Sequence, residues 1–482
     1  MASVMASFHM RFRRAGDGAA AMRPPSSPRS ALRLLRLAAA FLALAVFIAR
    51  PAAAQSILRD AETEALLHDM ANPLVKAAGL DPRNVDVVLV GDNTINAFVM
   101  NGQTVYLNAG LINAADSANQ VQGVIAHELG HVTGGHAISG EQGAKSAGTI
   151  SLLSLLIGAA AMAAGGGDAG MAAIMAGQSA AMGKYLAFSR VQEAQADAAG
   201  ATFLAKSGIS GRGSIEFFKK LEAEGYKRGY SQADQDPFMS THPLESDRIA
   251  LLEETYKKDP AWNRPSDPVL EARFRRAKAK LYGYLAEPEA VLAAYPVSDT
   301  SVPGRYARAY AWHKQALMDN AMGEVDALLQ TAPADPYFLE LKGQILLESG
   351  KPAEALAALR RATELTGNQP LIATTFGHAL VATEDPKNLA EAQRVLRAAV
   401  ARDRENPDAW YQLGVVYNAN GDGPRARLAS AEQQVLQQQW PLALGSAETA
   451  LSGLPTGSAD AIRAQDIAMQ ARAEIERRKK RK

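Results

Sequence analysis

The 482-residue chain contains no cysteine. It therefore has no disulfide framework and no lipobox cysteine for a lipid anchor, and we expect the mature protein to be a free soluble chain. It also lacks a strong charge of one sign, with 51 lysine and arginine against 50 aspartate and glutamate side chains. Nothing in this balance is typical of a protein that binds nucleic acid.

The apolar run near the N-terminus, residues 37–49, is short. A membrane-spanning helix needs about 20 apolar residues, so this run does not reach across a bilayer. Arginines precede it and residues 52–54, all alanine, follow it, which is the arrangement of a secretory signal peptide. We expect residues 1–54 to be removed, and the loss of eight arginines and Asp17 would leave 43 basic against 49 acidic side chains.

What is present is a metal-binding motif. Residues 127–131 read His-Glu-Leu-Gly-His, a complete H-E-x-x-H. Residues four apart on a helix lie one turn above each other, so His127 and His131 would project from one face and bind a single metal ion. Glu128 would then be placed to take a proton from a water molecule at the metal. The motif is short enough to occur by chance, so a catalytic assignment needs a third ligand.

Two sources of a third ligand can be compared. The metzincin pattern ends in a histidine where this chain has Ala137, and His136 stands one residue early. Since one residue turns a helical side chain by about 100°, we expect His136 not to reach the same metal. The other source is a carboxylate on a second helix, as in thermolysin-type sites. In a helix expected over residues 185–204, Glu193 can complete the ligand set and Asp197, four residues on, can accept the outer N–H of a ligating histidine. The plain alternative for this pair is a solvated helix face.

A third fragment, Ser-Thr-His-Pro at residues 240–243, precedes Arg248. Because His242 comes before a proline, its backbone is biased to extended geometry and we expect it on a loop. The simpler interpretation is the start of a helix, with residue 240 or 241 as the cap and the proline in the first turn. The two interpretations are compatible.

These fragments together resemble the HtpX and CAAX-prenyl-protease clan of zinc peptidases. The order of motifs is the same: Asn96-Ala97-Phe98, His127-Glu128-x-x-His131, Glu193-x-x-x-Asp197, and His242-Pro243 with Arg248. Because helical repeats follow, the chain is also similar to the periplasmic branch of that clan, the BepA-type chaperone–proteases of Gram-negative bacteria. The resemblance extends from about residue 56 to the C-terminus, and it is specific in the peptidase half and loose in the repeats.

The resemblance implies one zinc ion per chain, bound by His127, His131 and Glu193, with Glu128 as general base. It places His242 and Arg248 near the site, as regulatory or oxyanion-stabilising groups. In such sites zinc lowers the pKa of bound water to about 7 and polarises the scissile carbonyl. It further implies a zinc metalloendopeptidase of the periplasm that degrades misfolded or misassembled envelope proteins.

Residues 55–262 are expected to form the peptidase domain, with a zincin-like (gluzincin) α+β fold and a small sheet. The expected elements are a helix over residues 58–78, a strand at 85–90, and a hairpin of 96–100 with 104–107. Asn101-Gly102 between alternating apolar residues is the strongest short hairpin signal. We expect an extended substrate to pair with this strand edge at Asn96, Ala97 and Phe98 through backbone hydrogen bonds.

Between the two metal helices lie two apolar stretches, residues 149–164 and 171–182, separated by a glycine run. One interpretation is a membrane hairpin, and the other is a pair of packed or mobile helices that cover the active site. The first stretch is about sixteen residues long, against the 20 or so that a spanning helix needs, which favours a lid-like segment over residues 147–183. If exposed, residues 149–182 would adhere to misfolded chains or make peripheral membrane contact.

Residues 263–482 are expected to form an α-helical solenoid, which makes the protein mainly α. Residues 410–417 read W-x2-L-G-x2-Y, the core of a tetratricopeptide (TPR) repeat. Matching positions recur upstream: Pro336 and Pro370 are 34 residues apart, the expected period, and Pro407 follows after 37, with the surplus near residues 384–388. Weaker copies are expected before residue 333 and after Trp440.

Stacked helix pairs form a superhelix whose concave face binds segments of other proteins. We therefore expect the repeats to dock clients or, as the resemblance implies, the outer-membrane assembly machinery, although they could merely pack on the peptidase. Two classes of function compete: a zinc endopeptidase, and a chaperone or adaptor whose peptidase site is normally auto-inhibited. The complete ligand set with Glu128 favours the endopeptidase, because a pseudo-enzyme would be expected to have lost one of these residues.

Overall fold

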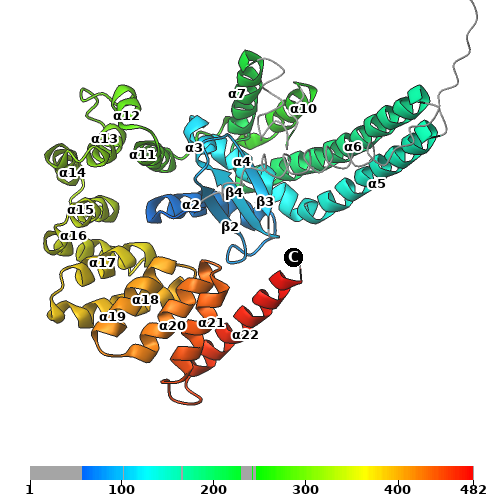
Figure 1. Ribbon diagram of the computed structural model, residues 1–482. Helices are drawn as coiled ribbons and strands as arrows, with labels where there is room; N and C mark the ends of the chain where they lie inside the picture. The colour runs from blue at the N-terminus through cyan, green and yellow to red at the C-terminus, as the bar shows by residue number, and fades with distance from the viewer. Residues whose placement is uncertain (1–56, 101, 164–166, 229–241, 243–245, 481–482) are drawn as a thin grey trace, which may run out of the picture. The chain divides into compact units, whose positions relative to one another are not determined.

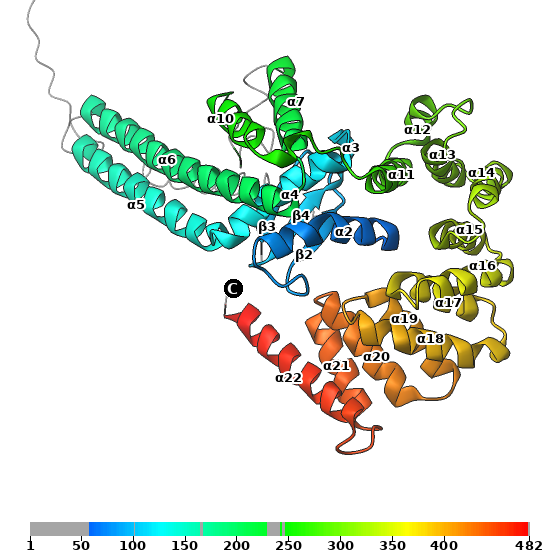
Figure 2. The same cartoon turned by 180° about the vertical axis from the view of Figure 1, so that it is seen from behind.

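The computed structural model describes residues 57–100, 102–163, 167–228, 242 and 246–480. The signal peptide expected over residues 1–54, the turn residue Asn101 and the neighbours of His242 on its loop lie outside these residues. The described elements are mainly helical, with one small sheet, as the sequence predicted. Figures 1 and 2 show the sheet with its surrounding helices and the helical repeats that follow.

The sheet has four strands in the order β1 (Ile57–Leu58), β2 (Asp86–Val90), β4 (Thr104–Asn108) and β3 (Ala97–Met100). β2 runs parallel to β4, and β1 and β3 pair antiparallel with β2 and β4. The hairpin predicted from Asn-Gly is confirmed: Phe98 lies opposite Tyr106, their rings stack at 5.0 Å, and Gly102 has a positive φ of 89°. β3 is therefore an edge strand of the described sheet.

The first helix, α2 (Ala61–Ala77), is shorter than the sequence predicted. It begins after Asp60, whose side chain accepts a hydrogen bond from the backbone N–H of Thr63 and so caps the helix. Leu58, expected at the start of this helix, instead pairs with β2 and forms β1 together with Ile57. The capping carboxylate decides where the helix starts.

Helix α4 (Ala118–Thr133) carries the H-E-x-x-H motif through the centre of this domain. Ser117 caps its start by accepting a hydrogen bond from the backbone N–H of Gln120, and Gly134 follows its last turn. Every residue from 118 to 131 is buried, because α2, β3, α6 (Gly167–Ser207) and α7 (Arg212–Arg228) surround the helix. A motif that must hold a metal ion is thus kept away from bulk water.

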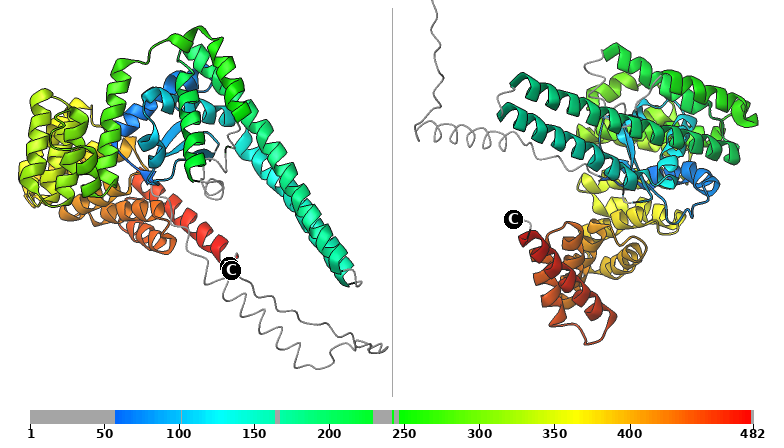
Figure 3. Two further views of the ribbon diagram at one scale, coloured as in Figure 1. Left: turned by 90° about the horizontal axis from the view of Figure 1, so that it is seen from above. Right: turned by 90° about the vertical axis from the view of Figure 1, so that its right-hand side faces the viewer.

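Helices α5 (His136–Ala163) and α6 pack side by side as a long hairpin, visible in Figure 3. α6 continues well beyond the 185–204 range predicted from the sequence. Among the described helices, one window has the length and composition to cross a membrane, Lys145–Met162, and 11% of it is buried. The apolar stretches between the metal helices are therefore helical and largely exposed.

The core of the first domain extends past residue 262, where the sequence placed its end. After α10 (Ser246–Lys257) and η1 (Pro260–Asn263), helix α11 (Pro268–Leu285) adds Phe274, Ala277 and Leu281 to the same apolar cluster as α2 and α4. Its Glu271 also accepts hydrogen bonds from the first backbone N–H groups of α4. A cut at 262 would pass through this core, and we propose a boundary near residue 286.

The remaining helices form consecutive antiparallel pairs. They are α12 (Pro288–Ala294), α13 (Val302–Lys314), α14 (Met318–Thr331), α15 (Pro336–Glu348), α16 (Pro352–Leu365), α17 (Pro370–Ala382), α18 (Leu389–Arg402), α19 (Pro407–Ala419), α20 (Gly423–Leu436), α21 (Trp440–Leu451) and α22 (Ala459–Lys479). The short helix α3 (Ala109–Ala114) belongs to the first domain, between β4 and α4. The three prolines of the predicted period each stand at the first position of a helix. The surplus residues of the longer repeat form a short 3-10 turn, η2 (Pro386–Asn388).

Candidate metal centre

The close crossing of α4 and α6 sets the geometry of the site. A Cβ on Gly130, inside the H-E-x-x-H motif, would lie 2.5 Å from the carbonyl oxygen of Ala196, and one on Gly200 would lie 3.0 Å from that of Ala126. The contact at Gly130 leaves no room for a side chain, and a side chain at Gly200 would require the two helices to shift slightly. Glycine at these positions therefore lets α6 bring its carboxylates against the histidine face of α4.

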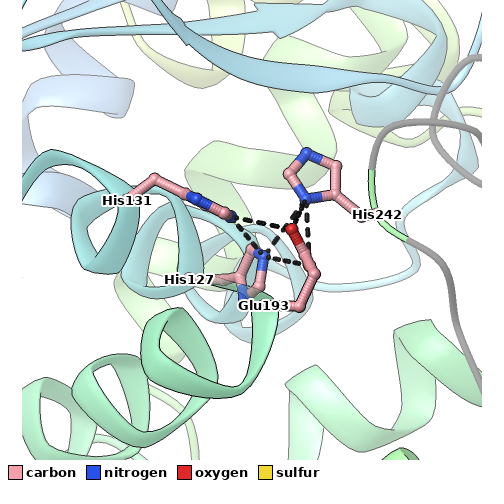
Figure 4. Close-up of side chains that lie close together, drawn as sticks. All are labelled: His127, His131, Glu193 and His242. Carbon is pink, nitrogen blue, oxygen red and sulfur yellow. Dashed lines mark hydrogen bonds and ion pairs between the residues drawn. The ribbon is translucent and has the colours of Figure 1, made fainter. Parts of the chain in front are cut away.

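Four buried side chains meet at this crossing: His127 and His131 from α4, Glu193 from α6, and His242 (Figure 4). One ligand atom from each lies within 4.8 Å of all the others. The two Nε2 atoms of the α4 histidines are 3.1 Å apart, and each lies 3.3 Å from a carboxylate oxygen of Glu193. Ligands about 2.0–2.1 Å from a tetrahedral zinc ion are separated by about 3.3 Å, so this donor set fits zinc.

His242 joins the cluster from the loop before α10. Its Nδ1 lies 3.1 Å from Glu193 Oε1 and 3.3 Å from His127 Nε2, while its Nε2 lies 3.3 Å from the backbone carbonyl oxygen of Ala97. An Nε2–H that donates to this carbonyl leaves the Nδ1 lone pair facing the cluster. The side chain therefore contacts both the metal-ligating groups and the edge strand β3.

Asp197 lies where the sequence predicted an outer partner for a ligating histidine. Its Oδ1 is 2.9 Å from His127 Nδ1 and accepts a second hydrogen bond, 2.8 Å, from Arg248 Nη2. The same guanidinium lies 3.0 Å from Glu193 Oε2. Burial alone would raise the pKa of Asp197, but the hydrogen bonds from Arg248 and His127 outweigh it and lower that pKa. Arg248 thus ties both carboxylates to fixed positions.

Charge at the site favours a cation. Burial lowers the pKa of His127, but its hydrogen bonds to Asp197 and Glu193 and their negative charges outweigh burial and raise it to about 10. The Glu193 carboxyl is also buried, yet its hydrogen bonds to three histidines lower its pKa. The field that favours a proton on His127 also favours a divalent metal ion among these groups.

His136 has a role that the sequence did not reveal. It stays outside the four-residue cluster, as predicted, but its Nδ1 lies 2.9 Å from His131 Nδ1, and its Nε2 lies 3.0 Å from Gln195 Oε1. If Gln195 accepts the Nε2–H, His136 Nδ1 accepts the Nδ1–H of His131 and leaves the Nε2 lone pair of His131 facing the cluster. Because His136 stands one residue early, it does not reach the cluster and instead contacts the outer nitrogen of His131.

Glu128 differs from its neighbours in having no hydrogen-bond partner among the described residues. Both carboxylate oxygens are fully buried and accept no hydrogen bond from the residues that the structure describes. The imidazole Nε2 of His242 lies 3.6 Å from Glu128 Oε1, beyond hydrogen-bond distance. Buried acceptors without partners are rare and costly, and they are typical of carboxylates that act on water or substrate.

The three residues predicted to receive substrate lie at the edge strand beside this cluster. Ala97 is wholly buried and offers its carbonyl oxygen to His242, while Phe98 stacks on Tyr106. The side-chain oxygen of Asn96 is buried, and no described residue donates to it. The structure thus brings β3, H-E-x-x-H, Glu193 and His242 together from four separate segments.

A buried H-E-x-x-H helix, a carboxylate from a second helix and an adjacent edge strand define a zinc metallopeptidase, here joined to a helical-repeat domain. Residues 60–256 match the model of Peptidase family M48, and residues 319–441 match that of the Cytochrome c-type biogenesis protein H TPR domain. The chain therefore carries an M48 peptidase domain followed by a TPR domain, and it is a metalloendopeptidase that uses zinc.

Several curated proteins are similar over most of their length. The chain is 23% identical over 431 residues to the beta-barrel assembly-enhancing protease of Yersinia pestis, covering 86% of this chain and 85% of that protein. The protein of the same name from Escherichia coli K12 is 24% identical, with 77% and 75% covered. Metalloprotease LoiP of Escherichia coli K12 is 29% identical over 40% of this chain and 70% of its own length.

Solved TPR structures also match. The TPR protein YrrB, described as having an unusual peptide-binding site, is 24% identical with a TM-score of 0.30, over 37% of this chain and 92% of that one. MamA is 20% identical with a TM-score of 0.28, over 36% and 96%.

Proposed function

We propose that this protein is a periplasmic endopeptidase that cleaves unfolded or misassembled envelope proteins and docks them, or the outer-membrane assembly machinery, through its TPR domain. The observation that carries the proposal is the placement of a buried zinc-binding cluster against β3, the edge strand of the described sheet. Such an edge recognises extended backbone rather than a particular sequence. A peptidase of this design would cleave unfolded chains in preference to folded ones, whatever their sequence.

The roles of the site residues follow from their contacts. His127, His131 and Glu193 hold the zinc ion, which when bound supplies a Lewis acid that activates water and polarises the scissile carbonyl. Glu128, whose carboxylate oxygens accept no hydrogen bond from a described residue, takes a proton from the attacking water and delivers it to the leaving nitrogen. Asp197 orients His127. In each case the hydrogen bonds of the side chain determine its role.

Arg248 acts on the site through its carboxylates. The sequence left open whether this residue or His242 stabilises the oxyanion. Its guanidinium hydrogen-bonds Asp197 and lies within ion-pair distance of Glu193. We assign Arg248 the role of holding these two carboxylates in place, because its guanidinium N–H groups point at Asp197 and Glu193.

His242 regulates access in this proposal. Its Nδ1 faces the ligand atoms, where it would fill the position that a catalytic zinc site keeps open for water. Its Nε2 meets the Ala97 carbonyl, which a strand-like substrate would need for its own N–H. One side chain thus blocks both the nucleophile and the substrate backbone, and the enzyme rests in a closed state. This contact is also what favours the second candidate function, a chaperone or adaptor with a shut site.

The TPR domain offers a hollow suited to an acidic or carboxylate-ended peptide segment. It measures about 560 Å³ and is lined by four arginines, by the acidic residues Glu432, Asp460 and Asp466, and by apolar and aromatic side chains. Two of its arginines pair with acidic neighbours, Arg425 with Asp460 and Arg463 with Glu432. The other two, Arg397 and Arg404, form no ion pair with a described residue, and Trp410 lies beside them. Arginines of this kind bind carboxylates.

The location and partners are supported by the relatives and by the N-terminus. The similar proteins of Yersinia pestis and Escherichia coli are named for enhancing beta-barrel assembly. The first 54 residues carry the pattern of an export signal. Both support a protein that works in the periplasm on chains destined for the outer membrane.

A substrate trap tests the proposal. The Glu128→Gln chain, expressed in the periplasm, should retain envelope proteins that can be identified by mass spectrometry after affinity capture. The Glu193→Ala chain serves as the matched control, since it loses both zinc and substrate binding at the site. Equal recovery with the two variants would contradict the proposed peptidase role. If Glu128→Gln restored barrel assembly as well as the unaltered chain does, the chaperone function would be favoured instead.

A further inference from the structure

The α5–α6 hairpin presents its large apolar side chains outward. Six of them, each more than half exposed, are Leu152, Leu153, Leu156, Ile157, Met171 and Met175. Leu152, Leu153, Leu156 and Ile157 share one broad face of α5, and Met171 and Met175, four residues apart, share one face of α6. A soluble helical hairpin normally turns such residues toward its partner helix.

The closest backbone approach of the two helices is made by small residues, with Ile174 and Met162 packed against the glycines. Ser154 and Gly158 of α5 meet Gly177 and Gly170 of α6, so closely that a Cβ on Gly177 would lie 1.9 Å from the Cβ of Ser154. A Cβ on Gly158 would lie 2.6 Å from the backbone oxygen of Gly170. Small residues inside and large apolar residues outside is the arrangement of helices that pack within lipid.

The polar side chains of the hairpin satisfy one another or the local backbone. Ser151 and Gln178 hydrogen-bond across the helix pair at 3.0 and 2.7 Å. Ser154 donates to the carbonyl of Ser151, and Thr149 donates to that of Lys145. In water such groups need no protein partner, whereas in a hydrocarbon environment each of them does.

The dimensions of the apolar part match a bilayer. The window Lys145–Met162 has 18 residues, about 27 Å at 1.5 Å per residue, close to the hydrocarbon thickness of about 30 Å. Because Ser151 pairs with Gln178, Lys145 lies at the level of Lys184 and of the half-exposed Tyr185. Between the two lysines, Asp168 at the far turn is the one charged residue in the sequence. Lysine and tyrosine at one end are typical of the headgroup region.

The continuity of α6 argues against a lid over the site. Gly170 and Glu193 belong to one helix and are 23 residues apart, which places them about 35 Å from each other. The apolar end of the hairpin therefore lies far from the metal cluster, as Figure 1 shows for the ends of α5 and α6. Its exposed side chains are not covering the active site.

We propose that the α5–α6 hairpin inserts into a phospholipid bilayer, with Lys145 and Lys184 at one surface and Asp168 at the other. Lipid acyl chains are then the partner of the outward leucines and methionines. Since Glu193 follows Lys184 by nine residues, about 13 Å of helix, the metal cluster is held close to the membrane surface. Resting on the proposed function, this restricts substrates to chains that are extended at a membrane.

Vesicle flotation of the full mature chain tests the insertion directly. The chain should float with phosphatidylethanolamine–phosphatidylglycerol vesicles, and Leu153→Lys with Leu156→Lys should abolish flotation, since each buried lysine weakens binding by about 70-fold or more. Leu251→Lys, at a leucine of α10 that is 68% exposed, is the matched control and should float normally. Flotation of the double-lysine chain equal to that of the control would overturn the proposal.

The absence of native cysteine allows a second measurement. Leu156→Cys accepts a single environment-sensitive fluorophore, whose emission should shift to the blue with vesicles and be quenched by lipids brominated in their acyl chains. The same label at Leu251→Cys should show neither effect. A response at residue 156 without lipid, accompanied by self-association, would identify a second copy as the partner and refute insertion; so would a response to unfolded protein alone.

The two proposals can fail separately. Glu128→Gln removes the general base of the proposed function and leaves the hairpin unchanged. It should therefore float as well as the unaltered chain. Flotation with no proteolysis in any variant would contradict the proposed function alone, and proteolysis without flotation would contradict the insertion alone.

Discussion

Replacing His242 by alanine should increase proteolysis, because the imidazole closes the site in the resting enzyme. Its ring nitrogens contact described groups on both sides: Nε2 lies beside the carbonyl oxygen of Ala97 and Oε1 of Glu128, and Nδ1 lies beside Glu193 and His127. All of these groups are buried. The variant removes these contacts while leaving the three other ligating side chains in place.

The size of the effect follows from these contacts. With the Nε2–H tautomer, Nδ1 has no proton to donate, so the closed state is favoured by the one buried hydrogen bond to the carbonyl of Ala97, about 1 kcal/mol net. This energy corresponds to about a 5-fold preference for the closed state, and its removal should raise the rate about 5-fold. A bond from Nδ1 to zinc would add to this figure. If His242 were instead an oxyanion donor, the rate would fall by about 10²-fold or more.

The assay is the initial rate of hydrolysis of an unfolded protein, with zinc content measured on the same samples. His68→Ala, at an exposed histidine of α2, is the matched control and should leave the rate unchanged. Combining His242→Ala with Glu128→Gln should abolish the gain, which ties it to this site. A His242→Ala chain that keeps its zinc and loses activity would refute the plug.

The remaining predictions address the ligands, the domain boundary and pH. Glu128→Gln should abolish proteolysis yet keep about one zinc per chain by metal analysis, whereas Glu193→Ala should lose zinc as well. A chain ending at residue 286 should still hydrolyse a short unfolded peptide but lose pull-down of envelope partners; one ending at Trp262 should melt at a lower temperature, because it lacks the core side chains of α11. Burial raises the pKa of Glu340 from 4.5 to about 8, so the folded chain keeps a proton that the unfolded chain loses. Stability should therefore fall by at most about 1.4 kcal/mol per pH unit between pH 5 and 8, and thermal melts of Glu340→Gln should lack this fall.

Each of these has a contrary outcome. Full zinc content and activity in the Glu193→Ala chain would contradict the three-ligand set. Equal pull-down by the chain that ends at 286 would make the repeats a scaffold rather than a docking surface. Parallel melting curves for Glu340→Gln and the unaltered chain from pH 5 to 8 would show that this carboxyl is ionised in the fold.

Features set by neighbouring residues could be predicted from the sequence. The two histidines share a helix face because they are four residues apart. Asn101-Gly102 predicted the hairpin because a tight turn needs positive φ, which Gly102 adopts. The spacing of the prolines predicted the repeat period, and each stands at a helix start because it lacks an N–H and has a helical φ. In each case the physical cause acts within a few residues.

Long-range features depended on how helices pack. The sequence suggested Glu193 as a ligand, but its approach to His127 depends on glycines that let α4 and α6 cross closely. His136 was excluded from the metal by its phase, whereas its contact with His131 required the chain to turn at Gly134 and bring Gln195 opposite. No local sequence pattern predicts such a contact between distant segments.

The hairpin shows the division most clearly. Its composition by itself determined that residues 149–182 are apolar, and its length favoured a lid over a membrane segment. Only the tertiary structure decided which side chains face inward, because glycine and serine allow the two backbones to approach and leave the leucines and methionines outside. Composition determines how much apolar surface a segment has, and packing decides where that surface points.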